Sequence, residues 1–292
     1  MTKPQATATI LLGATFMSFV GLTMRMIDQA DGFQILIYRS AALAGMIALM
    51  ACLKRKVSPL SFLRSLDRND MVMGFALSVA FTTYVFAMLN TSVASTLFIL
   101  SISPLFAALM AWAWLGERPT KITLVAMGLA IIGVGLMVQS GATQGRSLGN
   151  IFAFISAACF ALMLTLARRS RKTDVLGGTF MGGIFCVVIG ITCALLLGNG
   201  LSVSQYDLWL SLFMGGFTIG IGIGFVTWGT PYVPAAEVGL LVLLESVLGP
   251  IWVWLFVNEA MSSSEIIGGI IVLTAIAGQA AFGRRPSRVK AI

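Results

Sequence analysis

Ten apolar stretches, each about 20 residues long, make up most of the chain. A helix rises 1.5 Å per residue, so a stretch of this length crosses the hydrocarbon core of a bilayer. A membrane β-barrel would show alternating segments of about ten residues instead. The pattern predicts an all-α polytopic membrane protein. The predicted transmembrane helices lie near residues 7–27, 33–53, 71–89, 93–115, 120–138, 149–167, 176–197, 208–229, 236–256 and 263–282.

Composition supports this class and excludes others. Hydrophobic residues form 58% of the chain and charged residues 10%, which leaves too little polar surface for a soluble protein of 292 residues. No phosphate-binding glycine–lysine loop is present, so a gradient would have to drive any transport. The chain has no histidine, and its four cysteines show no metal-ligand spacing. We expect no metal, no cofactor and no enzymatic activity, since no nucleophile constellation stands out either.

Basic residues predict the orientation. Of 19 Lys and Arg residues, 16 fall at the ends of stretches on the side that carries both termini. Only Arg25 and Arg146 fall on the other side, and Arg39 lies inside the second stretch. The positive-inside rule therefore places both termini in the cytoplasm, with the chain in the cytoplasmic (inner) membrane. The net charge of +8 is explained by this orientation, so we expect no nucleic-acid partner.

The chain contains an internal repeat. Residues 74–117 resemble residues 216–259 at a constant offset of 142. The matching pairs are Gly74 and Gly216, Phe75 and Phe217, Phe86 and Trp228, Ala94 and Ala236, Trp112 and Trp254, and Glu117 and Glu259. Further out, Arg25 and Arg168 match one residue outside this register.

The offset covers five stretches, so the second copy would insert upside down. We predict two inverted five-helix repeats, 1–138 and 149–292, the second ending in a basic tail, with a linker at 139–148. Inverted repeats are typical of secondary transporters, whose substrate site lies between the halves.

Two short motifs carry a family resemblance. In the fourth stretch Pro104 leads into LGERPT, and in the ninth Pro250 leads into VNEAMS. A helix with an early glycine follows each motif, at Gly128 and at Gly268. With the two five-helix units, these features resemble the drug/metabolite transporter superfamily in its ten-helix EamA-type form, over nearly the whole chain. The length and the pair Tyr38-Arg39 in the second stretch resemble the aromatic amino-acid exporter branch.

This resemblance implies an inner-membrane exporter of amino acids or related metabolites. It also implies a central cavity lined mainly by helices 1, 3, 4, 6, 8 and 9. Met17, Phe160 and Met163 lie on these helices and could form an apolar wall for a substrate; packing or lipid-facing roles are equally ordinary for such residues.

The two prolines predict hinges. Pro104 frees a backbone carbonyl near Leu100, so residues 100–104 form a candidate hinge and polar wall. Pro250 and Gly249 are the matching candidates in the ninth helix, and a static kink is the alternative at both places. The second proline lies four residues nearer its glutamate, so we expect the helix break to differ between the halves.

Glu245 is the candidate for substrate binding or proton coupling. It lies about 13 Å along the ninth helix, where an ionised carboxylate costs several kcal/mol unless paired, hydrated or protonated. It could bind a substrate amino group or carry a proton, or it could form a fixed pair with Arg39. Arg39 could bind a substrate carboxylate, snorkel to the interface, or lock the second helix against a neighbour. We favour a structural role for Arg39.

Other polar residues accompany Glu245. Ser103 occupies the matching repeat position, so one position is polar in both copies, and Ser101 lies nearby. The third helix adds Ser78, Thr82 and Tyr84 as candidate substrate contacts. The glycines of the eighth stretch favour close helix packing over flexibility.

The sequence thus predicts a carrier that exports small metabolites, above all amino acids, by alternating access. A multidrug exporter of the same superfamily is the alternative. Proton antiport and facilitated diffusion stay open, as do the direction and the oligomeric state. The expected partners are a small-molecule substrate and the lipid bilayer.

Overall fold

The computed structural model describes residues 1–116, 119–143, 145–170, 174–197, 200–233 and 235–282, and every regular element in these ranges is a helix. Within them ten segments are long and apolar enough to cross a membrane, which confirms the predicted fold class. These spans are Lys3–Met26, Gly32–Arg55, Arg68–Asn90, Val93–Trp114, Lys121–Gln139, Ser147–Arg169, Leu176–Leu196, Gln205–Tyr232, Glu237–Val257 and Ser263–Phe282.

Several spans consist of more than one helical element. The elements in chain order are α1 (Lys3–Ser18), α2 (Val20–Met26), α3 (Gly32–Arg55), α4 (Pro59–Arg64), α5 (Arg68–Asn90), α6 (Val93–Leu100), α7 (Ser103–Leu115), α8 (Lys121–Thr143), α9 (Ser147–Arg169), α10 (Leu176–Leu196), α11 (Gln205–Phe213), the π-helical η1 (Met214–Ile221), α12 (Gly222–Gly229), the short 3₁₀ segment η2 (Thr230–Tyr232), α13 (Ala235–Val257) and α14 (Ser263–Phe282). The connection between the halves is shorter than the predicted linker, because α8 continues to Thr143 and α9 begins at Ser147.

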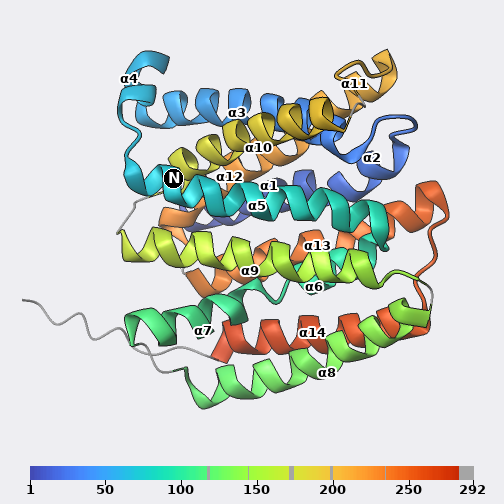
Figure 1. Cartoon of the computed structure of the whole chain (residues 1–292). Helices are drawn as coiled ribbons and strands as arrows, with labels where there is room; N and C mark the ends of the chain where they lie inside the picture. Colours follow the sequence, from blue (N-terminus) through green and yellow to red (C-terminus); the bar gives the residue numbers. More distant parts are fainter. Residues whose placement is uncertain (117–118, 144, 171–173, 198–199, 234, 283–292) are drawn as a thin grey trace, which may run out of the picture.

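The helices run side by side across Figure 1, with α3 and α10 along the top and α8 and α14 along the bottom. The beginning of α1 and the end of α14 lie at the end that we call the terminal end (Figure 1). The α5–α6 turn and the α2–α3 connection lie at the other end, which we call the distal end (Figure 1).

The packing of the spans is reciprocal. The second span packs on the seventh (α3 on α10) and the fifth on the tenth (α8 on α14). The contact of α5 with α9 has its counterpart in that of α12 with α1, and the contact of α7 with α9 in that of α13 with α1. Two related halves of opposite orientation produce this pattern.

Capping side chains define where helices begin at the distal end. The Asp31 carboxylate accepts hydrogen bonds from the N–H groups of Phe33 (2.7 Å) and Gln34 (3.0 Å) at the start of α3. The Ser92 hydroxyl accepts from the N–H of Ser95 (3.0 Å) at the start of α6. These bonds satisfy backbone donors that have no partner inside the helix, so they set the residue at which each helix enters the bundle.

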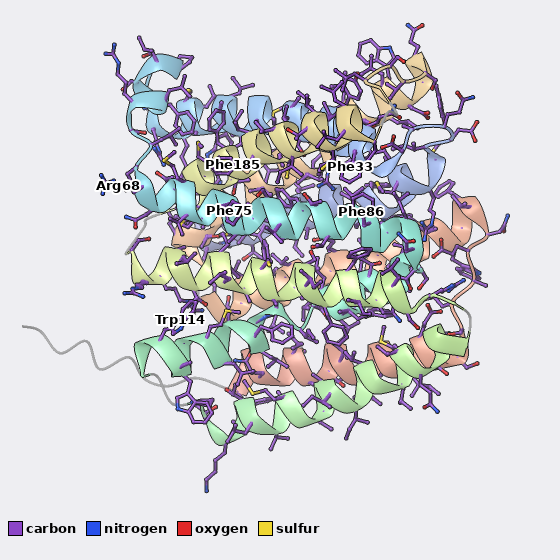
Figure 2. The ribbon with its side chains drawn as sticks, in the orientation of Figure 1. Phe33, Arg68, Phe75, Phe86, Trp114 and Phe185 are labelled. Carbon is purple, nitrogen blue, oxygen red and sulfur yellow. The ribbon has the colours of Figure 1, made fainter. Side chains whose placement is uncertain are left out.

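Aromatic pairs join α5 to its neighbours. Phe33 of α3 faces Phe86 at 4.9 Å between ring centroids, and Phe75 faces Phe185 of α10 at 6.4 Å (Figure 2). Both pairs are edge-on, the arrangement that aromatic quadrupoles prefer.

Glycines allow the closest helix contacts. A Cβ added to Gly13 of α1 would lie 2.7 Å from the carbonyl oxygen of Gly222, and one added to Gly222 would lie 3.0 Å from that of Gly13. Gly133 of α8 and Gly268 of α14 face each other in the same reciprocal way. The prediction that glycines of the eighth span serve close packing is therefore confirmed for Gly222, where any side chain would overlap α1.

Two spans are interrupted and one is locally widened. The first breaks at Phe19 between α1 and α2, and the fourth breaks between Leu100 and Ser103, just before Pro104. The eighth contains the π-helical η1. The ninth differs, because α13 stays helical through Pro250. The expected difference between the fourth and ninth spans is confirmed, whereas the break at Phe19 was not predicted.

Candidate functional site at the helix interruptions

The interrupted spans meet α13 in the middle of the bundle. The indole N–H of Trp252 donates to the hydroxyl of Ser18 (2.9 Å), and the Trp252 ring stacks on Phe19 with centroids 5.0 Å apart. The Ser246 hydroxyl reaches the carbonyl oxygen of Leu97 in α6 (3.4 Å). Gly249 lies against the Leu97 side chain, where an added Cβ would overlap it. Segments of both halves thus converge beside the central part of α13.

Glu245 lies in this central part of α13. Its side chain is neither fully buried nor exposed in the structure. Within the described part of the chain no hydrogen-bond or ion-pair partner of its carboxylate is found. A carboxylate so deep in a membrane protein is costly to ionise without water, a proton or a cationic ligand.

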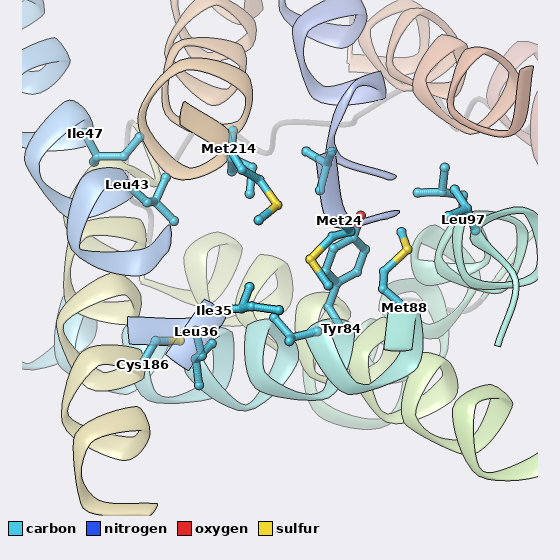
Figure 3. Packing of buried hydrophobic residues seen from close by; sticks show 14 of the residues in the cluster. Met24, Ile35, Leu36, Leu43, Ile47, Tyr84, Met88, Leu97, Cys186 and Met214 are labelled. Carbon is cyan, nitrogen blue, oxygen red and sulfur yellow. The ribbon is translucent and has the colours of Figure 1, made fainter. Parts of the chain in front are cut away.

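Tyr84 of α5 is a predicted substrate contact, and it is buried. Figure 3 shows its ring between Met24 and Met88 in the largest apolar cluster. The Arg39 guanidinium of α3 lies over this ring, 5.7 Å from its centroid.

The other two predicted substrate contacts of α5, Ser78 and Thr82, differ in their hydrogen bonding. Ser78 is buried and donates to the carbonyl oxygen of Phe75 in its own helix (2.8 Å). The Thr82 hydroxyl is enclosed and has no hydrogen-bond partner among the described residues. A site role for both residues stays a prediction.

Arg39 is fully buried, so it does not snorkel to the membrane interface. Its guanidinium lies over the rings of Phe81 (5.4 Å to the centroid) and Tyr84 (5.7 Å), and it donates to the Phe81 carbonyl oxygen (3.4 Å). It forms no ion pair with Glu245 in the described structure, so the fixed pair considered from the sequence is absent there. Cation–π contacts lock α3 against α5, which agrees with a structural role.

Ser101 and Ser103 lie at the break of the fourth span. Both are buried; the Ser101 hydroxyl donates to the Phe98 carbonyl oxygen (2.7 Å), and the Ser103 hydroxyl donates to that of Leu100. These bonds satisfy the carbonyls that the break before Pro104 frees. These two carbonyls therefore have hydroxyl donors at the break, and the hinge role of Pro104, Pro250 and Gly249 stays a prediction.

The three predicted apolar contacts are spread over the bundle. Met17 of α1 packs on Gly222 of α12. Met163 of α9 is buried in a cluster with Met73 and other residues of α5, and Phe160 packs against the same cluster. A substrate role for these residues stays a prediction, because the structure places each in helix packing.

Sequence reasoning missed a polar cluster at the distal end. Its centre is the ion pair of Arg25 and Glu259, beside a pocket of about 300 Å³. The pocket is lined by Arg25, Leu89, Asn90, Thr91, Ser92, Arg146 and Glu259. From the sequence alone, glutamates at helix ends such as Glu259 are interpreted as capping or loop-anchoring groups, and no sequence signal links Glu259 to Arg25. Glu117 lies outside the described residues, and Glu237 pairs with Lys3 at the terminal end (2.9 Å).

A second pocket of the structure is apolar and is not lined by Glu245. It has a volume of about 420 Å³ and lies between α1, α13 and α14. No group of three potential metal ligands is found among the described residues.

Ten membrane-spanning helices in two reciprocal halves, with polar groups where the helices break, define a membrane transporter. The model of the EamA-like transporter family matches residues 6–139 and 147–279, and the chain belongs to this family. The two matches fall on either side of the connection between α8 and α9.

Two similar proteins agree with this assignment. An uncharacterized transporter of Archaeoglobus fulgidus is 26% identical over 220 residues, which cover 73% of this chain and 78% of that protein. A crystal structure of a protein with 20% sequence identity covers 96% of this chain and 99% of its own, with a TM-score of 0.68. At that identity the likeness supports the fold alone.

Proposed function

We propose that the protein is a secondary carrier that exports amino acids across the cytoplasmic membrane by alternating access of its two halves. The observation that carries the proposal is Glu245, an acid without a described partner at the convergence of helices from both halves. In this proposal the carboxylate binds the substrate ammonium group, which offsets the cost of a charge at this depth.

The surroundings of Glu245 fit a zwitterion with an apolar side chain. Tyr84 offers a hydroxyl and an aromatic face, and the positive charge of Arg39 lies beneath its ring. This charge favours a substrate carboxylate near the phenol, while the apolar residues around the ring suit a hydrophobic side chain. We assign Arg39 to positioning Tyr84, because it is buried behind the ring.

The interruptions supply the movement that alternating access needs. We propose that the fourth span bends between Leu100 and Ser103, where hydroxyls already satisfy the freed carbonyls. Bending there would carry α7 relative to α6 without exposing backbone groups to lipid. The distribution of basic residues supports cytoplasmic termini, so the terminal end would face the cytoplasm.

A multidrug exporter is the second candidate. Its support is also Glu245, because a lone acid with the apolar neighbours Leu243, Leu244 and Val247 along α13 would suit a hydrophobic cation. The two candidates differ in what they require of the ligand: a carrier of amino acids needs a carboxylate on it, and a carrier of cations does not.

Counterflow in proteoliposomes tests the proposal. Vesicles loaded with unlabelled amino acids are challenged with one labelled amino acid at a time, and saturable accumulation of one or a few is expected. Competition then separates the candidates: N-acetylated amino acids, which lack the ammonium group, should not compete in either case. Effective competition by hydrophobic amines without a carboxylate would favour the multidrug candidate. Absence of accumulation by folded, inserted protein would overturn the amino-acid assignment.

A further inference from the structure

We propose that Arg25 and Glu259 form a gate that closes the distal end of the bundle, and that this ion pair must break in each transport cycle. The inference rests on the proposed alternating access, but its geometry and its test are independent of the substrate. Under the predicted orientation this is the outer gate.

One guanidinium joins three segments. Arg25, in the last turn of α2, forms an ion pair through Nε with the carboxylate of Glu259, in the connection between α13 and α14. Its Nη1 donates to the carbonyl oxygen of Met88, and its Nη2 donates to that of Thr91 (2.7 Å). The fork of donors on arginine makes this three-way contact possible.

Glu259 completes the closure from the second half. Its other carboxylate oxygen accepts from the N–H of Val93 (2.8 Å), the first residue of α6. The pair therefore holds the start of the fourth span, the end of the third and the end of the first against the connection that follows the ninth. These are spans of both halves, so separation of the halves at this end must break the pair.

A second acid strengthens the same end. Glu265 of α14 is buried at 3% exposure and accepts hydrogen bonds from the hydroxyls of Ser92 and Ser95. Arg146 lies 3.6 Å from its carboxylate. Glu265 thus ties the start of α6 to α14 directly behind the gate.

Both ends carry ion pairs between the halves. At the terminal end Lys3 and Glu237 pair at 2.9 Å with side chains 57% and 35% exposed, and Asp174, which is 7% exposed, pairs with Arg55 (3.0 Å) and Lys54 (3.6 Å). At the distal end each partner of the pair is 20% exposed, and α13 packs there against α2 and α6. The described contacts therefore close the distal end, and the proposal concerns the opening of this end.

The setting of the pair allows it to open. A fully buried pair would be hard to separate, because each charge would lose its partner in a low dielectric. Arg25 and Glu259 instead line the polar pocket of about 300 Å³, where water can replace each lost hydrogen bond. The pair can therefore act as a reversible latch.

Arg168 offers a matched control. It is related to Arg25 by the repeat, one residue out of register, and it lies in the last turn of α9. Its side chain is exposed, and no ion pair of Arg168 is found among the described residues. Its replacement removes the same charge without touching the distal gate.

Accessibility of a single cysteine tests the gate without any substrate. In the full chain with its four native cysteines replaced, Ser101→Cys is labelled with a membrane-impermeant thiol reagent, from the distal side in one vesicle orientation and from the terminal side in the other. We expect Glu259→Gln and Arg25→Gln to raise distal labelling about tenfold and to lower terminal labelling. Each variant removes a charge-assisted contact that exists only in the state closed at the distal end, so the equilibrium shifts toward the state open at that end. Arg168→Gln should leave distal labelling unchanged.

Two further results distinguish a gate that opens from an ion pair that only stabilises the fold. Arg25→Lys keeps the charge but loses the three-way fork, so its distal labelling should be intermediate. Unchanged labelling in both Gln variants, or a parallel rise from both sides as in general loosening, would overturn the proposal. Failure of amino-acid counterflow alone would overturn only the proposed substrate, since the labelling uses none.

Discussion

The fourth and ninth spans occupy the same place in the two halves, yet they differ where they meet. The fourth is broken between Leu100 and Ser103, and serine hydroxyls satisfy its freed carbonyls. The ninth is one continuous helix through Pro250, and it carries Glu245 at the position that matches Ser103. Duplication has thus separated two properties: one copy has the bend, and the other has the charge.

Removing the negative charge of Glu245 from the ninth span should have the largest effect on transport. Glu245→Gln keeps the shape of the side chain but removes the negative charge, so substrate affinity in counterflow should fall about a hundredfold, the equivalent of roughly 3 kcal/mol for a bond between charged groups. Glu237→Gln, in the first turn of the same helix, is the control and should stay near wild type. Equal activity of both variants would remove Glu245 from the substrate site.

The prolines should respond in opposite directions. Pro250 lies inside α13 and lacks the N–H that would donate to the Ser246 carbonyl, so Pro250→Ala should raise the free energy of unfolding by about 1–3 kcal/mol. Pro104 lies in the first turn of α7, where proline is favourable, so Pro104→Ala should lower it by about 0.4–1 kcal/mol. Thermal unfolding in detergent measures both. Shifts of the same sign would show that the two prolines play equivalent roles.

Removing the hydroxyls of Ser103 and Ser246 should give the smallest difference in stability between the two spans. Ser103→Ala removes the hydrogen bond to the Leu100 carbonyl oxygen and leaves this oxygen without a donor. The free energy of unfolding should therefore fall by about 1 kcal/mol. Ser246→Ala removes a long bond of 3.4 Å to the Leu97 carbonyl, so its effect should stay under about 0.5 kcal/mol. The same thermal unfolding measurement checks both variants. A larger loss of stability for Ser246→Ala than for Ser103→Ala would contradict the conclusion that serine hydroxyls stabilise the break of the fourth span.

Much of the fold could be predicted because a bilayer restricts the choices. The number and approximate limits of the spans follow from the length of apolar runs, and the offset of 142 indicates their inverted arrangement. The break at Phe19 could not be predicted in this way. No proline marks it, and it depends on the contact of Phe19 with Trp252, which is distant in sequence.

The candidate site could be predicted only in part. Glu245 stands out because an acid in the middle of an apolar run needs an explanation. Phe160 and Met163 do not stand out, since helical position alone cannot distinguish a cavity wall from packing against α5. The distal gate was hidden for another reason: Arg25 and Glu259 are 234 residues apart, and their pairing depends on the tertiary arrangement.

The reciprocal contacts of Gly13 with Gly222 and of Gly133 with Gly268 have a practical consequence for spectroscopy. At these four positions backbone lies directly on backbone, so a spin label or fluorophore would push apart the two helices whose distance it was meant to report. Probes belong instead at Gly45 or Gly239, where an added Cβ meets no atom within 4 Å. A distance measured between those two sites would describe the protein and not the label.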